Sequence, residues 1–177
     1  MGTQIVEYYK IVPDGLKWKK NGIIFYSKAA LEAAEQEKKA ALETAGMVDN
    51  GDGTVTDKQT GLMLAKDAST PTVGSCEGGL MHWDEAHKYI KCLNSANYLR
   101  HNDWKLPTKE QWESLVKSKE DVKNLKKIFS GMQSWYWSST TDADSTSSAW
   151  YVSMGLGYVD DDDMSGLNYV WPVRLGQ

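Results

Sequence analysis

Long apolar runs are absent from this chain of 177 residues. No segment approaches the roughly 20 consecutive apolar residues that a membrane-spanning helix needs. Residues 1–10 include Glu7 and lack the apolar stretch of about 7–15 residues that marks a secretory signal, so we expect no signal peptide there. Hydrophobic residues still make up 41% of the chain and charged residues 25%, a composition typical of a globular protein with its own core.

Cysteine is scarce, and this limits the covalent and metal chemistry of the chain. Cys76 and Cys92 are its two cysteines, without a Cys-x-x-Cys pair or a neighbouring group of histidines. A structural zinc site is therefore not expected. Cys76 and Cys92 are 16 residues apart. A disulfide between them and a pair of free buried thiols both remain open.

Basic residues are missing from the C-terminal quarter. Residues 128–173 contain six Asp and no Lys or Arg, whereas residues 1–127 hold 19 Lys and Arg against 18 Asp and Glu. Nucleic acids and anionic membrane surfaces are bound largely through Lys and Arg. The distribution of charge therefore argues against both as partners of this region.

Phenylalanine is rare, with two residues against eight Trp and nine Tyr. Trp and Tyr offer a polar edge beside an apolar ring. Between residues 135 and 171 they alternate with Ser, Thr, Asp and Asn, which is the composition of an antibody paratope. We expect Trp137 and Trp150 to lie in the core. The others cannot all be buried in so short a sheet: Trp135, Trp171, Tyr136, Tyr158 and Tyr169.

Residues 1–46 form an N-terminal segment with two recognisable elements. A β-prone run covers residues 5–12, and Asn21-Gly22 between two further β-prone runs predicts a hairpin within residues 16–26. Residues 27–46 predict a helix that Ser27 caps and Gly46 ends. Because the apolar face of this helix is narrow, it either packs on the domain edge or joins copies of the chain in a homo-oligomer.

Residues 47–177 predict one α+β domain. The motifs Thr54-Val55-Thr56 and Leu62-Met63-Leu64 are separated by turn signals, as in a hairpin. Amphipathic helices are expected over 83–99, 109–118 and about 121–129, the second with a capping box of Thr108 and Gln111. An extended segment is expected at 103–107, and strands alternate with turns from residue 131 onward.

Two acidic segments invite a calcium prediction, which their spacing does not support. The loop 49–60 has Gly51, Gly53 and Thr60 where an EF-hand needs oxygen ligands, so a tight hairpin explains it better. The run Asp160–Asp163 repels itself and needs solvent or a cation. In a strand, Asp160 and Asp162 would point to the same side. A solvated loop or edge, a surface for a cationic partner and a calcium site are the three interpretations.

The sequence contains no recognised catalytic motif. The histidines are His82, His87 and His101, and neither a Gly-x-Ser-x-Gly turn nor a His-Glu-x-x-His pair occurs. A glycosidase-like pair of carboxylates is the remaining route to an enzyme. We therefore expect a protein without catalytic residues, without a bound metal and without a cofactor.

A series of motifs in fixed order resembles the C-terminal domain family of Legionella collagen-like proteins. The resemblance covers about residues 47–174 and rests on the following segments: Asn50–Asp57, Thr60–Met63, Trp83–Ala86, Asp103–Glu110, Tyr136–Thr140, Ala149–Val152 and Val170–Arg174. It implies a branch of the C-type lectin fold, with two main helices and a small twisted antiparallel sheet that closes near its own start. The formylglycine-generating-enzyme branch is similar, but its cysteines near the end have no counterpart after Cys92.

The resemblance also implies where a ligand would bind. In variable proteins of diversity-generating retroelements this fold places hypervariable residues in its last 40 or so positions. The matching residues are Tyr136, Asp142, Asp144, Tyr158, Asp160, Asp161, Asp162, Asp163, Asn168 and Trp171. The Pro-containing calcium tripeptide of sugar-binding lectins is missing, Lys105 replaces the usual Arg, and Trp171 stands where Arg is common.

We therefore interpret the chain as a non-enzymatic binding protein. Residues 47–177 would be the C-type lectin-like binding domain, and residues 1–46 would pack on it or mediate oligomerisation. The expected partner is a protein or glycan at a cell surface. The alternatives are a structural module of a phage tail or cell-envelope fibre and an enzyme that acts on a saccharide. Cell-surface and virion locations are both compatible with the sequence.

Overall fold

The computed structural model describes residues 18–20, 23–25 and 28–176. The chain divides into two compact units, Met1–Ala40 and Ala41–Gln177. The predicted domain boundary after residue 46 falls six residues later than this division, because the last turn of the first helix belongs with the second unit. Ala41 in that turn is buried.

The first unit contains the predicted hairpin. Strands β1 (Trp18–Lys20) and β2 (Ile23–Phe25) pair antiparallel, with Trp18 opposite Phe25. The Asn21-Gly22 turn, the run 5–12 and the cap Ser27 lie outside the described residues. Helix α2 (Lys28–Ala45) follows and ends at Gly46, whose φ of 67° suits glycine at a helix C-terminus. The predicted hairpin strands and helix are thus confirmed.

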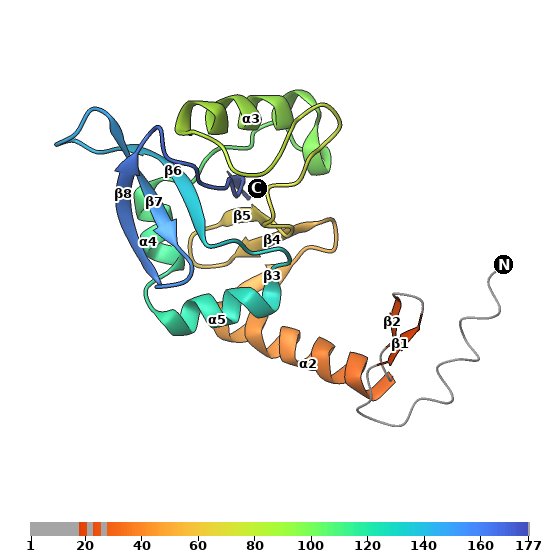
Figure 1. The fold of residues 1–177 in the computed structure, drawn as a ribbon. Coiled ribbons are helices and arrows are strands. Elements are labelled where there is room, and N and C mark those ends of the chain that lie inside the picture. Colours follow the sequence, from red (N-terminus) through yellow and green to blue (C-terminus); the bar gives the residue numbers. More distant parts are fainter. Residues whose placement is uncertain (1–17, 21–22, 26–27, 177) are drawn as a thin grey trace. The chain divides into compact units, whose positions relative to one another are not determined.

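The second unit is built on a four-stranded antiparallel sheet (Figure 1). Its strands are β3 (Met47–Asp49), β4 (Thr54–Asp57), β5 (Leu62–Ala65) and β9 (Val173–Leu175), in that order. The predicted hairpin is β4 and β5. Strand β9, near the end of the chain, pairs with β5, so the sheet closes near the start of the unit as the resemblance implied.

A second antiparallel sheet contains three strands in chain order. They are β6 (Trp135–Thr141), β7 (Ser148–Ser153) and β8 (Tyr158–Asp163). The four acidic residues 160–163 lie within β8, an edge strand, rather than in a loop. Together with the helices, the two sheets make the unit an α+β domain, as predicted.

Four helical segments accompany the sheets of the second unit. They are α3 (Trp83–Ser95), the 3₁₀ turn η1 (Tyr98–Arg100), α4 (Lys109–Leu115) and α5 (Lys119–Ile128). The predicted helix 83–99 is shorter in the structure because Asn97 adopts a left-handed conformation. The predicted helix 109–118 ends early because Ser118 caps α5. The capping box of Thr108 and Gln111 is confirmed.

Tryptophan side chains dominate the core. Trp104, Trp112, Trp137 and Trp171 are each at most 1% exposed. Their indole N–H groups donate to the backbone oxygens of Tyr98, Trp137, Met81 and Ala65, respectively. A buried indole is stable only when its N–H finds an acceptor. These bonds therefore tie distant segments to one another, and they explain how a chain with two Phe builds its core.

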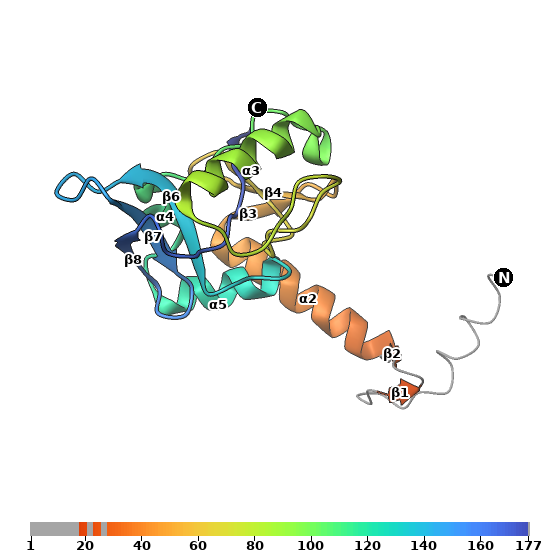
Figure 2. The ribbon, with the colours of Figure 1, turned by 45° about the horizontal axis from the view of Figure 1, so that its top comes forward.

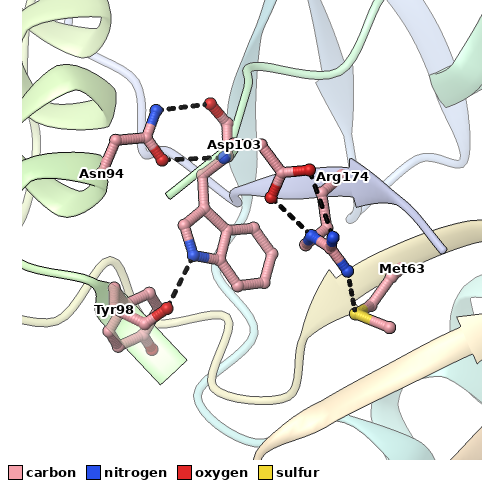
Figure 3. A network of polar contacts seen from close by, with 6 residues as sticks. Met63, Asn94, Tyr98, Asp103 and Arg174 are labelled. Carbon is pink, nitrogen blue, oxygen red and sulfur yellow. Dashed lines mark hydrogen bonds and ion pairs between the residues drawn. The ribbon is translucent and has the colours of Figure 1, made fainter. Parts of the chain in front are cut away.

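A polar network joins α3, the extended segment 103–107 and β9 (Figure 3). The Asn94 amide brackets the backbone of Trp104, donating to its oxygen and accepting from its nitrogen at 2.9 and 2.7 Å. Arg174 donates two hydrogen bonds to the Asp103 carboxylate, at 2.6 and 3.1 Å. Lys105 and Val173 exchange backbone hydrogen bonds. The predicted extended segment is confirmed.

The two cysteines form a disulfide. The Cys76–Cys92 bond joins the loop before α3 to α3 itself, with the Cα atoms 5.7 Å apart. Of the two interpretations left open by the sequence, the structure contains the disulfide, and no free cysteine occurs among the described residues.

Candidate functional site

The three-stranded sheet has two faces of different character. Residues directly opposite each other in paired strands share a face, and neighbours along a strand alternate. Tyr136 lies opposite Val152, which lies opposite Val159, and these three residues define an inner face. Trp135 is aligned with Ser153 and Tyr158 on the other, outer face. The register thus separates side chains that are adjacent in the sequence.

The inner face packs on α4, which contacts all three strands and lies behind the sheet in Figure 1. Tyr136 is fully buried beside Trp112 and Trp171, with ring centroids 5.9 and 5.3 Å away. Trp150, which we expected in the core, is only partly buried. The Lys109 ammonium covers it instead, 3.1 Å from the ring centroid.

The outer face carries exposed rings beside exposed carboxylates. Trp135 and Tyr158 are 48% and 41% exposed. Tyr151, which is partly buried, lies directly opposite Asp160, and Asp162 follows Asp160 on the same side of β8. We call these five residues the aromatic–acidic face: Trp135, Tyr151, Tyr158, Asp160 and Asp162. Leu156, in the turn that joins β7 to β8, is also exposed.

One end of the outer face is covered by the chain that leaves β8. A Cβ atom on Gly166 would lie 2.6 Å from an Asp162 carboxylate oxygen, so this segment passes close against Asp162. Three residues further on, Tyr169 exchanges backbone hydrogen bonds with Trp135 and Trp137 of β6. Trp137, which lies opposite Tyr151 on this face, is fully buried, and Tyr151 is partly buried. Trp135, Tyr158 and Asp160 stay exposed, and Asp162 lies beside Gly166.

Hydrogen bonds to the backbone orient the two carboxylates. One oxygen of Asp160 accepts from the N–H of Asp161 at 3.1 Å, and one oxygen of Asp162 accepts from the N–H of Asp163 at 2.9 Å. Asp163 accepts from both the N–H and the hydroxyl of Ser165, and these bonds lower its pKa. Asp163 therefore stabilises the turn, whereas Asp160 and Asp162 each keep one oxygen directed elsewhere.

Tyr151 is coupled to its neighbours on this face. Its pKa is raised to about 12, first by burial, then by a hydrogen bond with Tyr158, and then by the charges of Asp160 and Asp162. The tyrosine hydroxyl thus stays protonated at neutral pH. The two carboxylates produce a negative potential over the rings.

The structure corrects three of the predicted ligand-binding residues. Tyr136, Asn168 and Trp171 are 0%, 3% and 0% exposed. The Tyr136 hydroxyl donates to the Ala68 oxygen, and Trp171 packs edge-to-face on Phe129. Asn168 pairs with Met81 through the backbone. These residues hold the C-terminal segment against the core and cannot contact a ligand in this structure.

The remaining predicted residues are accessible, but they do not form one site. Tyr158, Asp160 and Asp162 lie on the aromatic–acidic face. Asp161 lies on the other side of β8, opposite Trp150. Asp142 and Asp144 lie in the β6–β7 connection, where the Asp142 carboxylate accepts from the N–H of Asp144.

Two members of the face were missed as ligand-binding residues by the sequence analysis. Trp135 was recognised only as one of several rings that could not all be buried, and Tyr151 was not singled out. The period of two along β6 and β7, counted from Tyr136 and Val152 as inward positions, assigns both residues to the outer face, although it assigns the fully buried Trp137 there as well. This period can be used only once it is known which residues of the two strands face the core.

Other hollows and clusters of the domain are less suited to chemistry. A groove of about 560 Å³ is lined by apolar and polar side chains, mainly of α3, the extended segment and β9. His87 borders it, and burial lowers the pKa of this histidine. Within the described ranges, no three His, Cys, Asp or Glu side chains are grouped for a metal ion. The loop 49–53 is the tight turn we predicted, with Asp52 accepting two bonds from Thr54.

Residues 53–174 match the family model of the Lcl C-terminal domain. The chain belongs to this family. The match begins in the turn before β4 and ends at Arg174 in β9, so the Lcl C-terminal domain includes the whole aromatic–acidic face. Strands β1 and β2 and helix α2 precede it. No curated protein matches the chain.

The family assignment confirms the resemblance drawn from the ordered motifs. In this Lcl C-terminal domain the motif 103–110 supplies the extended segment and the capped start of α4, and the motif 170–174 supplies Trp171 and β9. The motifs that identified the family are thus mainly elements of the core and its polar network. Among the helices in the described part of the chain, none is both long and apolar enough to cross a bilayer.

Proposed function

We propose that this Lcl C-terminal domain is a non-enzymatic binding module that presents its aromatic–acidic face to a protein or glycan at a cell surface. The observation that carries the proposal is the exposure of Trp135 and Tyr158 on one face of the sheet, on the two strands that flank Ser153 of β7, while the other face packs on α4. Large exposed rings on a rigid support lose little entropy on binding. On a C-type lectin fold, which the architecture is compatible with, the final strands are the expected position for a ligand.

The charges of the domain favour binding over catalysis. Acid catalysis by a carboxyl group needs a raised pKa. The resolved shifts of Asp52, Asp84, Asp103, Glu110 and Asp163 are all downward and are caused mainly by hydrogen bonds. The disulfide supports a location outside the reducing cytosol, because disulfides persist in oxidising compartments.

Diversification by a retroelement is a narrower form of the same proposal. Variation would be tolerated at the exposed positions Tyr158, Asp160 and Asp162, whereas changes at the buried Tyr136, Asn168 and Trp171 would disturb the core. An imperfect copy of the coding DNA for residues 135–171 beside a reverse transcriptase gene would support it. A copy whose differences fall on the buried positions would contradict it.

The binding proposal is tested by comparing two double variants with the wild-type chain. W135A/Y158A removes the rings of the face, and L80A/L175A removes two exposed side chains from other parts of the domain. Each protein is probed with a displayed library of random peptides and with a panel of immobilised neutral oligosaccharides.

We expect the wild type and L80A/L175A to bind the same members, and W135A/Y158A to lose them while its circular dichroism is unchanged. The proposal fails if the wild type binds neither class of probe, or if both variants bind as the wild type does.

A further inference from the structure

The carboxylates of β8 have no cationic partner within the described part of the chain. None of Asp160, Asp161, Asp162 and Asp163 forms an ion pair there, and residues 128–173 supply no Lys or Arg. The Lys109 ammonium of α4 lies over Trp150, the partner of Asp161 in the register, on the inner face. The outer face of β8 therefore keeps a concentrated negative charge next to its rings.

The position of the carboxylates suits a cation that also stacks. Each of Asp160 and Asp162 has one oxygen held by a backbone N–H, which fixes its direction and leaves the second oxygen able to accept. Tyr158 precedes Asp160 on the same side of the strand. Arginine is the side chain that stacks flat on an aromatic ring and donates to a carboxylate at the same time. A lysine ammonium would gain the charge attraction without the stacking.

The spacing along β8 adds a second requirement. Asp160 and Asp162 lie two residues apart in an extended strand, or about 7 Å at the usual rise of a strand. An extended partner segment has the same repeat, so that side chains two residues apart also point to one side. Two arginines with one residue between them would therefore reach both carboxylates, whereas adjacent arginines would point to opposite sides.

We infer that the partner of this face is an extended polypeptide segment that presents arginines at alternate positions. This inference rests on the proposed binding function and narrows it to one class of ligand. One arginine would stack against the rings of Tyr151 and Tyr158 and bind Asp160, and the other would bind Asp162 beside Gly166.

The test uses the full chain and three labelled peptides that carry equal charge. The peptides are Thr-Arg-Thr-Arg-Thr, its lysine counterpart Thr-Lys-Thr-Lys-Thr, and Thr-Arg-Arg-Thr-Thr, each with blocked ends. Fluorescence anisotropy in about 0.15 M salt gives the Kd. We expect the alternating arginine peptide to bind about tenfold more tightly than either of the others. The lysine peptide cannot stack on the rings, and the peptide with adjacent arginines can direct only one of them to this side. Equal affinities for the three would overturn the inference.

Two pairs of variants separate the site from net charge. D160N/D162N removes two charges from the face, and D142N/D144N removes two from the β6–β7 connection. G166A leaves the charge unchanged but pushes on Asp162, whereas G155A, in the β7–β8 turn, adds a Cβ in open space. We expect D160N/D162N to weaken binding of the alternating peptide about tenfold and G166A to weaken it measurably, with the two controls near the wild type. Equal losses in D160N/D162N and D142N/D144N would show attraction by net charge alone and refute the site.

Failure of this inference and failure of the proposed function would give different experimental results. If library peptides or oligosaccharides depend on Trp135 and Tyr158 but contain no alternating arginines, the binding function stands and the inference falls. If no ligand depends on those rings, both fall.

Discussion

At the scale of single residues, the polar partner of a side chain decides its role more than its chemical type does. Asp103 and Asp160 are both exposed carboxylates. Asp103 binds Arg174, which is buried and also contacts the Met63 sulfur, so it belongs to the frame of the domain. Asp160 accepts only from its neighbour's N–H and faces solvent. Tyr136 and Tyr158 differ in the same way, because the Tyr136 hydroxyl donates to a backbone oxygen in the core whereas Tyr158 is exposed.

The Arg174–Asp103 pair makes stability depend on pH in a defined direction. The pKa of Asp103 is lowered, first by the hydrogen bonds from Arg174. Because the folded pKa is below the unfolded one, this stabilisation is complete above the unfolded value of about 3.9 and is lost as the pH falls through the folded value. We expect D103N to lower the free energy of unfolding by about 1 kcal/mol near neutral pH. Below about pH 3, the difference from the wild type should shrink.

Urea unfolding at about pH 7 and about pH 3 measures the difference. The matched control is D84N, which breaks an ion pair with Lys88 in which both side chains are exposed. Such pairs contribute little, so D84N should unfold like the wild type. A D103N deficit that is equal at the two pH values would contradict the assigned role of Arg174.

At the scale of elements, helix α4 and the disulfide each hold another segment of the chain in place. Helix α4 has seven residues, yet its Trp112 supplies the ring against which Tyr136 packs. Its capping box sets where the helix begins, and therefore which side of the three-stranded sheet is covered. The Cys76–Cys92 bond anchors the loop before α3 in the same manner.

The disulfide should contribute substantially to stability. It closes a loop with a sequence separation of 16, for which the chain-entropy model gives about 3 kcal/mol. We expect C76S/C92S to lose a free energy of unfolding of this order, measured by urea unfolding under non-reducing conditions. Reductant should lower the stability of the wild type toward that of the variant and leave the variant unchanged. A wild type that is insensitive to reductant would refute the prediction.

At the scale of the whole molecule, the buried core belongs to one of the two units. The cluster of buried apolar side chains described in the structure begins at Ala41 and runs to Val173. The boundary between the units falls directly before it. We therefore expect folding of the Lcl C-terminal domain to depend on residues 41–177, and a role of residues 1–40 in oligomerisation stays a prediction.

A chain that starts at residue 41 should fold as the full chain does. We expect the urea midpoint of residues 41–177 to equal that of the second unit within the full chain, because the buried core found among the described residues is kept whole. Light scattering on both proteins tests oligomerisation: a smaller number of copies in the shortened chain would assign assembly to residues 1–40. Loss of cooperative unfolding on shortening would show that the core depends on the first unit.

Much of the fold could be predicted from the sequence because the relevant signals are local. Turn glycines, the Thr108 and Gln111 capping box and the alternation of apolar residues placed most helices and strands to within a few residues. The ordered motifs identified the family because they encode contacts within the frame, such as those of Trp104 and Arg174. The acidic character of residues 128–173 likewise follows from composition alone.

The accessible surface was decided by tertiary structure. Alternation along a strand divides Tyr136 from Trp135 and Asp161 from Asp160, but it does not say which set a helix from another part of the chain will cover. The packing of α4 on β6–β8 helps to bury Tyr136 and leaves Trp135 and Asp160 on the other side, where Trp137 is nevertheless buried and bonded to the Met81 oxygen. The burial of Trp171 and the pairing of Cys76 with Cys92 also depend on contacts between residues far apart in the sequence, for which no local pattern exists.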